Sequence, residues 1–136
     1  MYGIFNDNFP PIMDGVGLTA QNYAYWLHEK GHDISVVTPY APNSEEVIKA
    51  AKYPIYRYVS VPIPFRHPYR YGLPYIDPGF LKKWNKLNFQ LVHAHCPFTT
   101  GDLAYAAAQK QHIPLVATFH SKYRQDFEHN VKSKAV

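Results

Sequence analysis

The sequence has 136 residues, of which 46% are hydrophobic, so the chain is long and apolar enough for one domain with a buried core and is not intrinsically disordered. No leading segment resembles a signal peptide and no apolar run approaches the roughly 20 residues of a membrane-spanning helix, so we expect a cytoplasmic protein. The 14 basic and 10 acidic residues give a net charge of +4, which favours anionic partners.

The first part of the chain alternates between strand and helix patterns. Residues 2–6 (YGIFN) and 33–39 (DISVVTP) are apolar or β-branched runs, and both predict strands. Between them, apolar residues recur at steps of three and four from 18 to 30, and Gly31 follows where a left-handed C-cap belongs. This segment is therefore expected to be an amphipathic helix.

The middle of the chain predicts shorter elements. A short helix is expected to begin at Asn43, whose side chain can cap it, and residues 55–62 alternate as a third strand. Asp77 followed by Pro78 is typical of a helix start, and apolar residues continue along one face of this helix as far as Leu87.

The last part of the chain predicts two more strands. These are residues 89–95 (FQLVHAH) and 114–120 (PLVATFH), and the helix between them, 101–111, is expected to be capped by Thr99 or Thr100. Strands and helices thus alternate throughout, and the strands are rich in Val, Ile and Leu. This pattern predicts an α/β, Rossmann-like fold, in which a parallel sheet has helices on both faces.

Positive charge is concentrated in residues 57–86. This segment has six basic residues against one acidic residue, with five prolines and several tyrosines and phenylalanines among them. The prolines predict a long irregular loop, which either packs on its own aromatic side chains or faces a membrane surface or a stacked base. No nucleic-acid-binding motif accompanies the charge, so nucleic acid is not an expected partner. The basic residues are Arg57, Arg66, Arg70, Lys82, Lys83 and Lys86.

Histidines follow two of the predicted strands at the edge where open α/β sheets bind ligands. His93 and His95 are two residues apart and share one face of the fourth strand, and His120 ends the fifth strand. We expect the three imidazoles to converge on one crevice at the carboxyl ends of the strands.

The connection after the first strand contains the pattern G-x-G-x-x-A, formed by Gly15, Gly17 and Ala20. Glycines before a helix let backbone N–H groups approach a diphosphate at the positive end of the helix. A nicotinamide dinucleotide is disfavoured, because the motif begins about nine residues after the strand and no acidic residue ends the second strand. The alternative role for these glycines is a turn with tight helix packing.

Two long segments carry a family resemblance: DGVGLTAQNYAYWLHEKGHDISVVTP and FQLVHAHCPFTTGDLAYAAAQKQHIPLVATFHSKYRQDF. In this order, they resemble the N-terminal domain of group 1 retaining glycosyltransferases, which have the two-Rossmann GT-B architecture. The resemblance extends from near residue 1 to about residue 127. Members that act on diacylglycerol are similar in their H-x-H-x-P-F and TFH segments.

The resemblance implies a UDP- or GDP-sugar donor, whose diphosphate lies near Gly15 and Gly17, and a hydroxyl acceptor in the cleft between two domains. His120 matches the family histidine at the sugar and acceptor site, and we expect it to be catalytic. His95 matches a second position that lines the same cleft. No metal or other cofactor is implied for the chemistry.

Two basic residues follow the fifth strand. Lys122 and Arg124 are expected either to reach a phosphate in the acceptor and sugar site or to form a charged, solvated helix face.

Two other chemistries would use the same histidines. Together with Cys96 they form a conceivable metal set, but the adjacent His95-Cys96 pair lacks the usual zinc-ligand spacing. Cys96 is also disfavoured as a nucleophile, because Pro97 follows it and no helix begins there to lower its pKa. As the single cysteine of the sequence, it forms no internal disulfide.

The family has a second Rossmann domain that binds the nucleotide, and nothing in the sequence matches that domain. We therefore expect residues 1–136 to be a truncated, acceptor-side N-terminal domain that is inactive by itself. The similarity to diacylglycerol-modifying members predicts a lipid acceptor, with residues 57–86 in peripheral contact with the membrane. The alternative is a free-standing nucleotide-binding α/β module without catalysis.

Overall fold

The computed structural model describes residues 1–12, 14–118 and 120 and contains a five-stranded sheet. The strand order is β3-β2-β1-β6-β7, and every neighbouring pair is parallel. The strands that form this sheet are β1 (Tyr2–Phe5), β2 (Ile34–Pro39), β3 (Ile55–Tyr58), β6 (Leu91–Ala94) and β7 (Leu115–Ala117).

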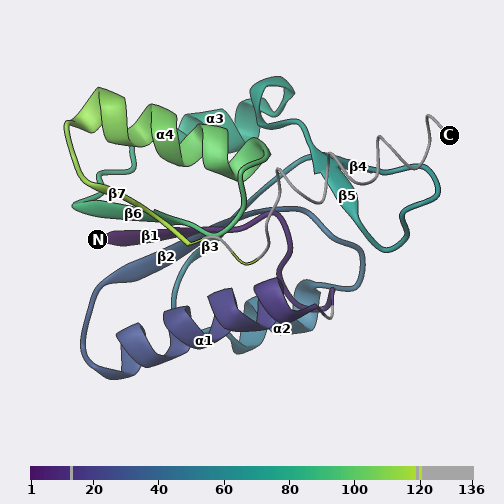
Figure 1. Cartoon of the computed structure of the whole chain (residues 1–136), viewed down its shortest axis with the longest axis horizontal. Coiled ribbons are helices and arrows are strands. Elements are labelled where there is room, and N and C mark those ends of the chain that lie inside the picture. The colour runs from purple at the N-terminus through teal and green to yellow at the C-terminus, as the bar shows by residue number, and fades with distance from the viewer. Residues whose placement is uncertain (13, 119, 121–136) are drawn as a thin grey trace, which may run out of the picture.

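Helices cover both faces of the sheet (Figure 1). The helices α1 (Gly15–Glu29) and α2 (Glu45–Ala50) lie on one face, and α3 (Pro78–Trp84) and α4 (Thr99–Gln111) lie on the other. Because successive strand residues point to opposite faces, Ile4 packs in the core beneath α1 while Phe5 packs in the core beneath α3 and α4. The α/β, Rossmann-like fold with helices on both faces is confirmed.

Two helix boundaries agree with the capping signals in the sequence. The Asp77 carboxylate accepts a hydrogen bond from the Phe80 N–H at 3.0 Å and caps α3, with Pro78 as its first residue. Gly31 has a φ of 89° after α1 and donates its N–H to the His28 carbonyl at 2.9 Å. This left-handed conformation favours glycine, so the predicted C-cap is confirmed.

Other predicted helix starts are wrong. Asn43 does not cap α2, because it lies outside the helix with a φ of 61° and Ser44 takes the N-cap position. Thr99 and Thr100 lie inside α4, which begins at Thr99 instead of residue 101. The cap of α4 comes from a distant part of the sequence, since the Asp7 carboxylate accepts from the Thr100 N–H at 3.2 Å. The sequence around Thr100 gives no sign of this cap, because Asp7 lies 93 residues earlier in the chain.

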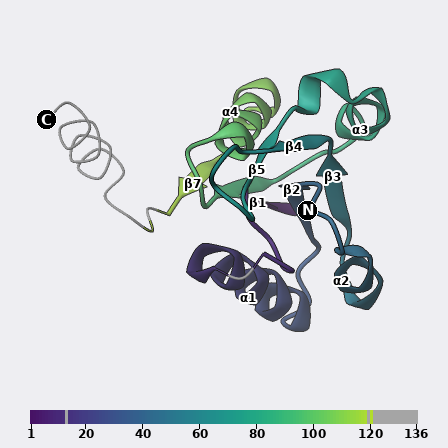
Figure 2. The same ribbon diagram turned by 90° about the vertical axis from the view of Figure 1, so that its right-hand side faces the viewer.

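The prediction of an irregular loop over 57–86 is also wrong in part. An antiparallel hairpin is formed by β4 (Ser60–Pro62) and β5 (Arg70–Gly72), and the 3₁₀ turn η1 (Pro74–Ile76) precedes α3. The expected third strand is therefore interrupted at Val59, whose N–H donates to the Asp77 carboxylate at 2.9 Å. Figure 2 looks onto the carboxyl ends of the parallel strands and shows the hairpin in front of them.

Candidate functional site

The site forms at the point where the strand order reverses, because β1 lies between β2 and β6 and the connections leave in opposite directions. The two central strands are joined past their ends by a hydrogen bond from the His95 N–H to the Phe5 carbonyl, at 2.9 Å. The residues that follow Phe5 and Ala94 therefore meet at one edge of the sheet.

Three imidazoles meet at this edge, as the spacing predicts. The rings of His93 and His95 are stacked with centroids 4.0 Å apart, and the His120 ring stacks on His95 at 5.2 Å. The Nδ1 atom of His95 lies 2.9 Å from the Nε2 atom of His120, and the Nε2 atom of His93 lies 2.6 Å from the Thr118 hydroxyl. We call these three residues the histidine stack.

The interior of the histidine stack is closed to solvent. The His95 side chain is 0% exposed, and the ring of Tyr23 from α1 lies 5.3 Å from it and 5.2 Å from the His93 ring. Burial, reinforced by the neighbouring imidazoles, lowers the pKa of His95 to about 3. Burial and His120 likewise lower the pKa of His93. Both rings are therefore neutral at physiological pH.

This burial changes the expected role of His95. A residue that is 0% exposed does not line an open cleft in this structure, whereas His120 is half-buried and reaches the surface. Of the two rings, solvent therefore reaches His120 and not His95. The three imidazoles lie together, as the sequence predicts, and the part of His95 in a sugar and acceptor site stays a prediction.

The predicted diphosphate glycines lie in the first turn of α1, not in a loop before it. The Asp14 carboxylate accepts from the Gly17 N–H at 2.7 Å and from the Asn8 side-chain amide at 3.0 Å. Gly17 is also tightly packed, because a Cβ atom there would lie 3.2 Å from the Asn8 carbonyl oxygen. A diphosphate that used the Gly17 N–H would therefore have to displace Asp14, whereas Gly15 has open space around it.

A cavity of about 700 Å³ opens between the first turn of α1 and the β4–β5 hairpin. We call it the hairpin cavity. It combines carboxylate, amide and guanidinium groups with aromatic rings, which is a mixture suited to a ligand with hydroxyl groups and apolar parts. The lining residues include Asp7, Asn8, Asp14, Arg66, Tyr69, Tyr71, Cys96 and Phe98. Gly15 lies between the lining residues Asp14 and Val16, so the glycine turn borders this cavity, while the histidine stack is not part of its lining.

Asp7, which lines the hairpin cavity, is a candidate site residue that the sequence reasoning did not identify. Its Oδ2 atom is buried without a hydrogen-bond partner among the described residues, and burial raises its pKa to about 6, with the charge of Asp102 as a smaller cause. Titratable groups with such shifts are common at functional sites. Its position directly after the central strand, at the edge where ligands bind, is a signal that would have identified it.

Cys96 has the properties of a packed, unreactive thiol. Its Sγ donates to the Asn6 amide oxygen at 2.8 Å, and burial raises its pKa to about 12. Across the residues that the structure describes, no three His, Cys, Asp or Glu side chains are arranged to hold a metal ion. Lys122 and Arg124 lie outside the described residues.

The strongly basic segment is less uniform than its sequence indicates. Arg57 pairs with Glu45 at 3.2 Å, and Arg70 donates to the Ser60 hydroxyl at 2.7 Å and the Ser60 carbonyl at 2.9 Å. Both guanidinium groups also lie over the Tyr40 ring. These two arginines stabilise the fold, so the exposed positive charge of the segment comes from Arg66, Lys82, Lys83 and Lys86.

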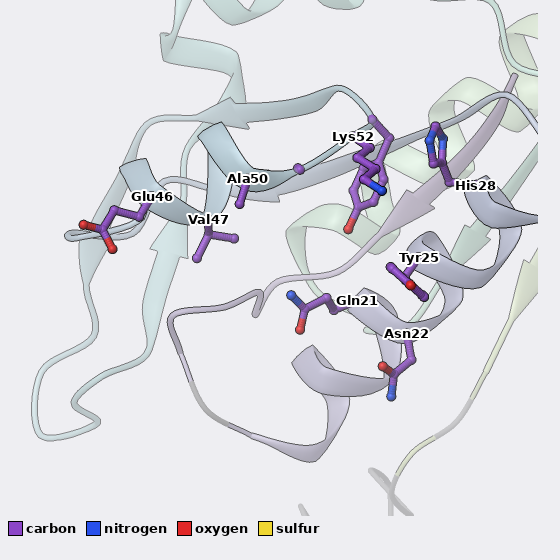
Figure 3. Close-up of a pocket in the computed structure, with 10 residues that line it drawn as sticks. Gln21, Asn22, Tyr25, His28, Glu46, Val47, Ala50 and Lys52 are labelled. Carbon is purple, nitrogen blue, oxygen red and sulfur yellow. The ribbon is translucent and has the colours of Figure 1, made fainter.

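A second groove lies between α1 and α2, on the face of the sheet that these helices cover (Figure 3). Gln21, Tyr25 and His28 of α1 face Glu46 and Val47 of α2 across it. Of the predicted site residues that the structure describes, none lines this groove, which has a volume of about 460 Å³.

Comparisons with known proteins identify the family of the chain. Residues 13–135 match the family model described as Glycosyltransferase Family 4. The chain is 31% identical over 129 residues to an alpha-monoglucosyldiacylglycerol synthase from Acholeplasma laidlawii, and this match covers 95% of the chain and 31% of that protein. A protein of the same name from Streptococcus pneumoniae is 24% identical over 132 residues, covering 95% of the chain and 28% of the relative.

A GDP-mannose-dependent alpha-mannosyltransferase from Corynebacterium glutamicum is 28% identical over 119 residues, covering 87% of the chain and 28% of that protein. The chain thus spans about a third of the length of the curated relatives it matches. No solved structure matches it significantly. The family match covers nearly the whole sequence, and the chain therefore belongs to glycosyltransferase family 4, as a GT-B N-terminal domain similar to those of diacylglycerol glycosyltransferases.

Proposed function

We propose that this chain is the acceptor-side domain of an enzyme that moves a hexose from a UDP- or GDP-sugar to a hydroxyl group with retention of configuration. The observation that carries the proposal is the half-buried His120, held 2.9 Å from the buried His95 at the point where the strand order reverses. The relatives named as an alpha-monoglucosyldiacylglycerol synthase and a GDP-mannose-dependent alpha-mannosyltransferase support the same class of reaction.

In this proposal, His120 is the catalytic residue of the domain. A neutral imidazole at a sugar site both donates and accepts hydrogen bonds, which suits recognition of hydroxyl groups and of charge that develops in the transition state. Gly15, at the positive end of α1, is the position where the donor diphosphate would approach the backbone. If Lys122 and Arg124 contact the same site, they would add positive charge for a phosphate.

The hairpin cavity is the proposed place of the acceptor. Asp7 and Asp14 supply oxygen atoms that accept hydrogen bonds from a hydroxyl group, and the aromatic rings of Tyr69 and Tyr71 supply apolar contact. This combination fits an acceptor with a hydroxyl head and an apolar body. We therefore favour a membrane lipid as the acceptor, consistent with the names of two of the relatives.

The proposed reaction is tested by a transfer assay on a longer protein that contains this chain. We expect transfer from either UDP-glucose or GDP-mannose to diacylglycerol in vesicles, with the α-configuration of the product established by NMR. The 136-residue chain alone is expected to give no product, because it spans about a third of the relatives' length. Nucleotide binding without transfer to any acceptor would contradict the proposal and support a nucleotide-binding module.

We further propose that the hairpin and α3 contact the cytoplasmic surface of an anionic membrane. Phe65, at the tip of the hairpin, is fully exposed and has a φ of 62°, a conformation uncommon for a bulky residue. Tyr75 and Ile76 are 65% and 68% exposed nearby in the chain. Exposed aromatic and apolar side chains beside free cations are typical of peripheral membrane contact. No helix in the described part of the chain is long and apolar enough to cross a membrane.

Neutralising two exposed cations of this surface is expected to weaken binding to anionic vesicles about thirtyfold at low salt, since each contributes on the order of 1 kcal/mol. The change is the double variant Arg66→Gln with Lys82→Gln, and the measurement is co-sedimentation. The matched control is Lys30→Gln with Lys110→Gln, two exposed lysines at the carboxyl ends of α1 and α4. Equal loss in both variants, or no binding to anionic vesicles, would contradict the membrane contact and favour a soluble acceptor.

A further inference from the structure

The buried imidazole of His95 has two ring nitrogens with different surroundings. Its Nδ1 atom lies 2.9 Å from the Nε2 atom of His120, whereas its own Nε2 atom is buried and has no hydrogen-bond partner among the described residues. A neutral imidazole has one N–H donor and one acceptor nitrogen. The His95–His120 pair therefore has two hydrogen-bonding arrangements, which differ in the ring nitrogen of His95 that is protonated.

The two arrangements leave different groups unpaired. If the proton is on Nε2 of His95, a buried N–H donor has no acceptor, and such orphaned donors are rare in proteins. If the proton is on Nδ1, that N–H donates to Nε2 of His120, and only a lone pair of His95 lacks a partner. The second arrangement makes the hydrogen bond between the rings and avoids a buried, unpaired N–H.

The surroundings of His95 indicate that its imidazole is neutral, so that only the position of one ring proton differs between the two arrangements. Its ring lies between the rings of His93 and His120, with Tyr23 against it, and none of these three neighbours is a carboxylate that would pair with a charged imidazole. The lowered pKa of His95 agrees that the ring holds a single proton. His93 is satisfied separately, because its Nε2 atom contacts the Thr118 hydroxyl at 2.6 Å.

We propose that His95 is a positioning residue that donates from Nδ1 to Nε2 of His120 and so fixes His120 in its Nδ1–H tautomer. This inference rests on the proposed function only in taking His120 as the residue that meets the substrate. The Nε2 atom of His120 is then occupied as an acceptor, and the N–H that His120 offers to a substrate is on Nδ1. A donor on Nδ1 can hydrogen bond to a sugar hydroxyl or to a developing oxyanion.

The tautomer is measured by long-range proton–nitrogen NMR on the ¹⁵N-labelled 136-residue chain near pH 7.5. We expect His120 to have a protonated Nδ1 and an unprotonated Nε2. His95→Asn, whose amide N–H can take the place of the Nδ1 donor, should keep this tautomer. His95→Leu should release His120 to the mixture of free histidine, in which Nε2–H predominates. The matched control, His93→Gln, changes the neighbouring ring and should leave the tautomer of His120 unchanged.

The wild-type spectrum alone decides the proposal even if His95→Leu does not fold. A protonated Nε2 on wild-type His120, or the same tautomer in a folded His95→Leu variant, would overturn it. In the longer protein, His95→Leu should lower kcat with little change in KM, and His95→Asn should restore most of it. If the tautomer differs from expectation while His120→Ala still lowers transfer by about 30-fold or more, only this inference fails. If the tautomer is as expected but no sugar is transferred, the proposed function fails instead.

Discussion

Replacing His120 with alanine is expected to lower the rate of sugar transfer by about 30- to 1,000-fold in a longer protein that contains this chain. One positioned polar contact to a transition state typically contributes about 2 to 4 kcal/mol, which corresponds to that range of rates. The loss of stability should be smaller, on the order of 1 kcal/mol, because His95 loses its partner while His120 itself is only half-buried and lies three residues beyond the last described strand. The measurements are kcat/KM with a saturating donor and the midpoint of thermal unfolding.

The control for this variant is His28→Ala. His28 is also half-buried, but it lies near the end of α1, in the groove between α1 and α2 and away from the strand ends. The same substitution there should leave the transfer rate within a factor of two or so of wild type, since it removes no contact to the reacting groups. A loss of tenfold or less for His120→Ala would indicate that His120 only closes a strand.

The fold could be predicted because its main signals are local. Apolar runs and three- and four-residue periodicity identified all five strands of the parallel sheet, β1, β2, β3, β6 and β7, and the helices between them. The hairpin was missed because its stability depends on contacts between distant residues. The Ser60 hydroxyl donates to the Tyr40 carbonyl and the Thr99 hydroxyl donates to the Gly72 carbonyl, and neither Tyr40 nor Thr99 lies within residues 57–86.

The site could be predicted only in part. Strand parity is enough to place His93 and His95 on one face, and the parallel order brings His120 beside them. The alternation of side chains along a strand does not predict how deeply each one is buried. The burial of His95 depends on Tyr23, which lies in a helix some 70 residues earlier in the chain. The capping role of Asp7 was missed for the same reason, since its partner Thr100 is distant in sequence.

Asp7 and His95 should affect the stability of the fold in opposite directions as the pH changes. The pKa of His95 falls from 6.5 to about 3 on folding, so the native state binds fewer protons and loses stability as the pH falls below about 6.5. The pKa of Asp7 rises from 3.8 to about 6, so the native state holds this proton more tightly. The contribution of Asp7 is fully present below its unfolded pKa and is lost as the pH rises through about 6. Between about pH 6 and 4, the two groups partly cancel.

Asp7→Asn should therefore raise the free energy of unfolding at pH 7.5 by up to about 3 kcal/mol, because it removes a buried charge while the amide oxygen still accepts from Thr100. The gain should shrink to nearly zero by pH 4, where Asp7 is protonated in the native protein. In the variant, the loss of stability that His95 causes on acidification should no longer be opposed by the protonation of Asp7. Urea unfolding of the 136-residue chain between pH 4 and 8 measures these differences.

The control is Asp33→Asn. The side chain of Asp33 is 79% exposed, so this substitution should change the stability little at any pH. If Asp7→Asn instead destabilised the chain equally at pH 7.5 and pH 4, the folded state would not disfavour the ionised carboxylate. The raised pKa of Asp7 would then be contradicted.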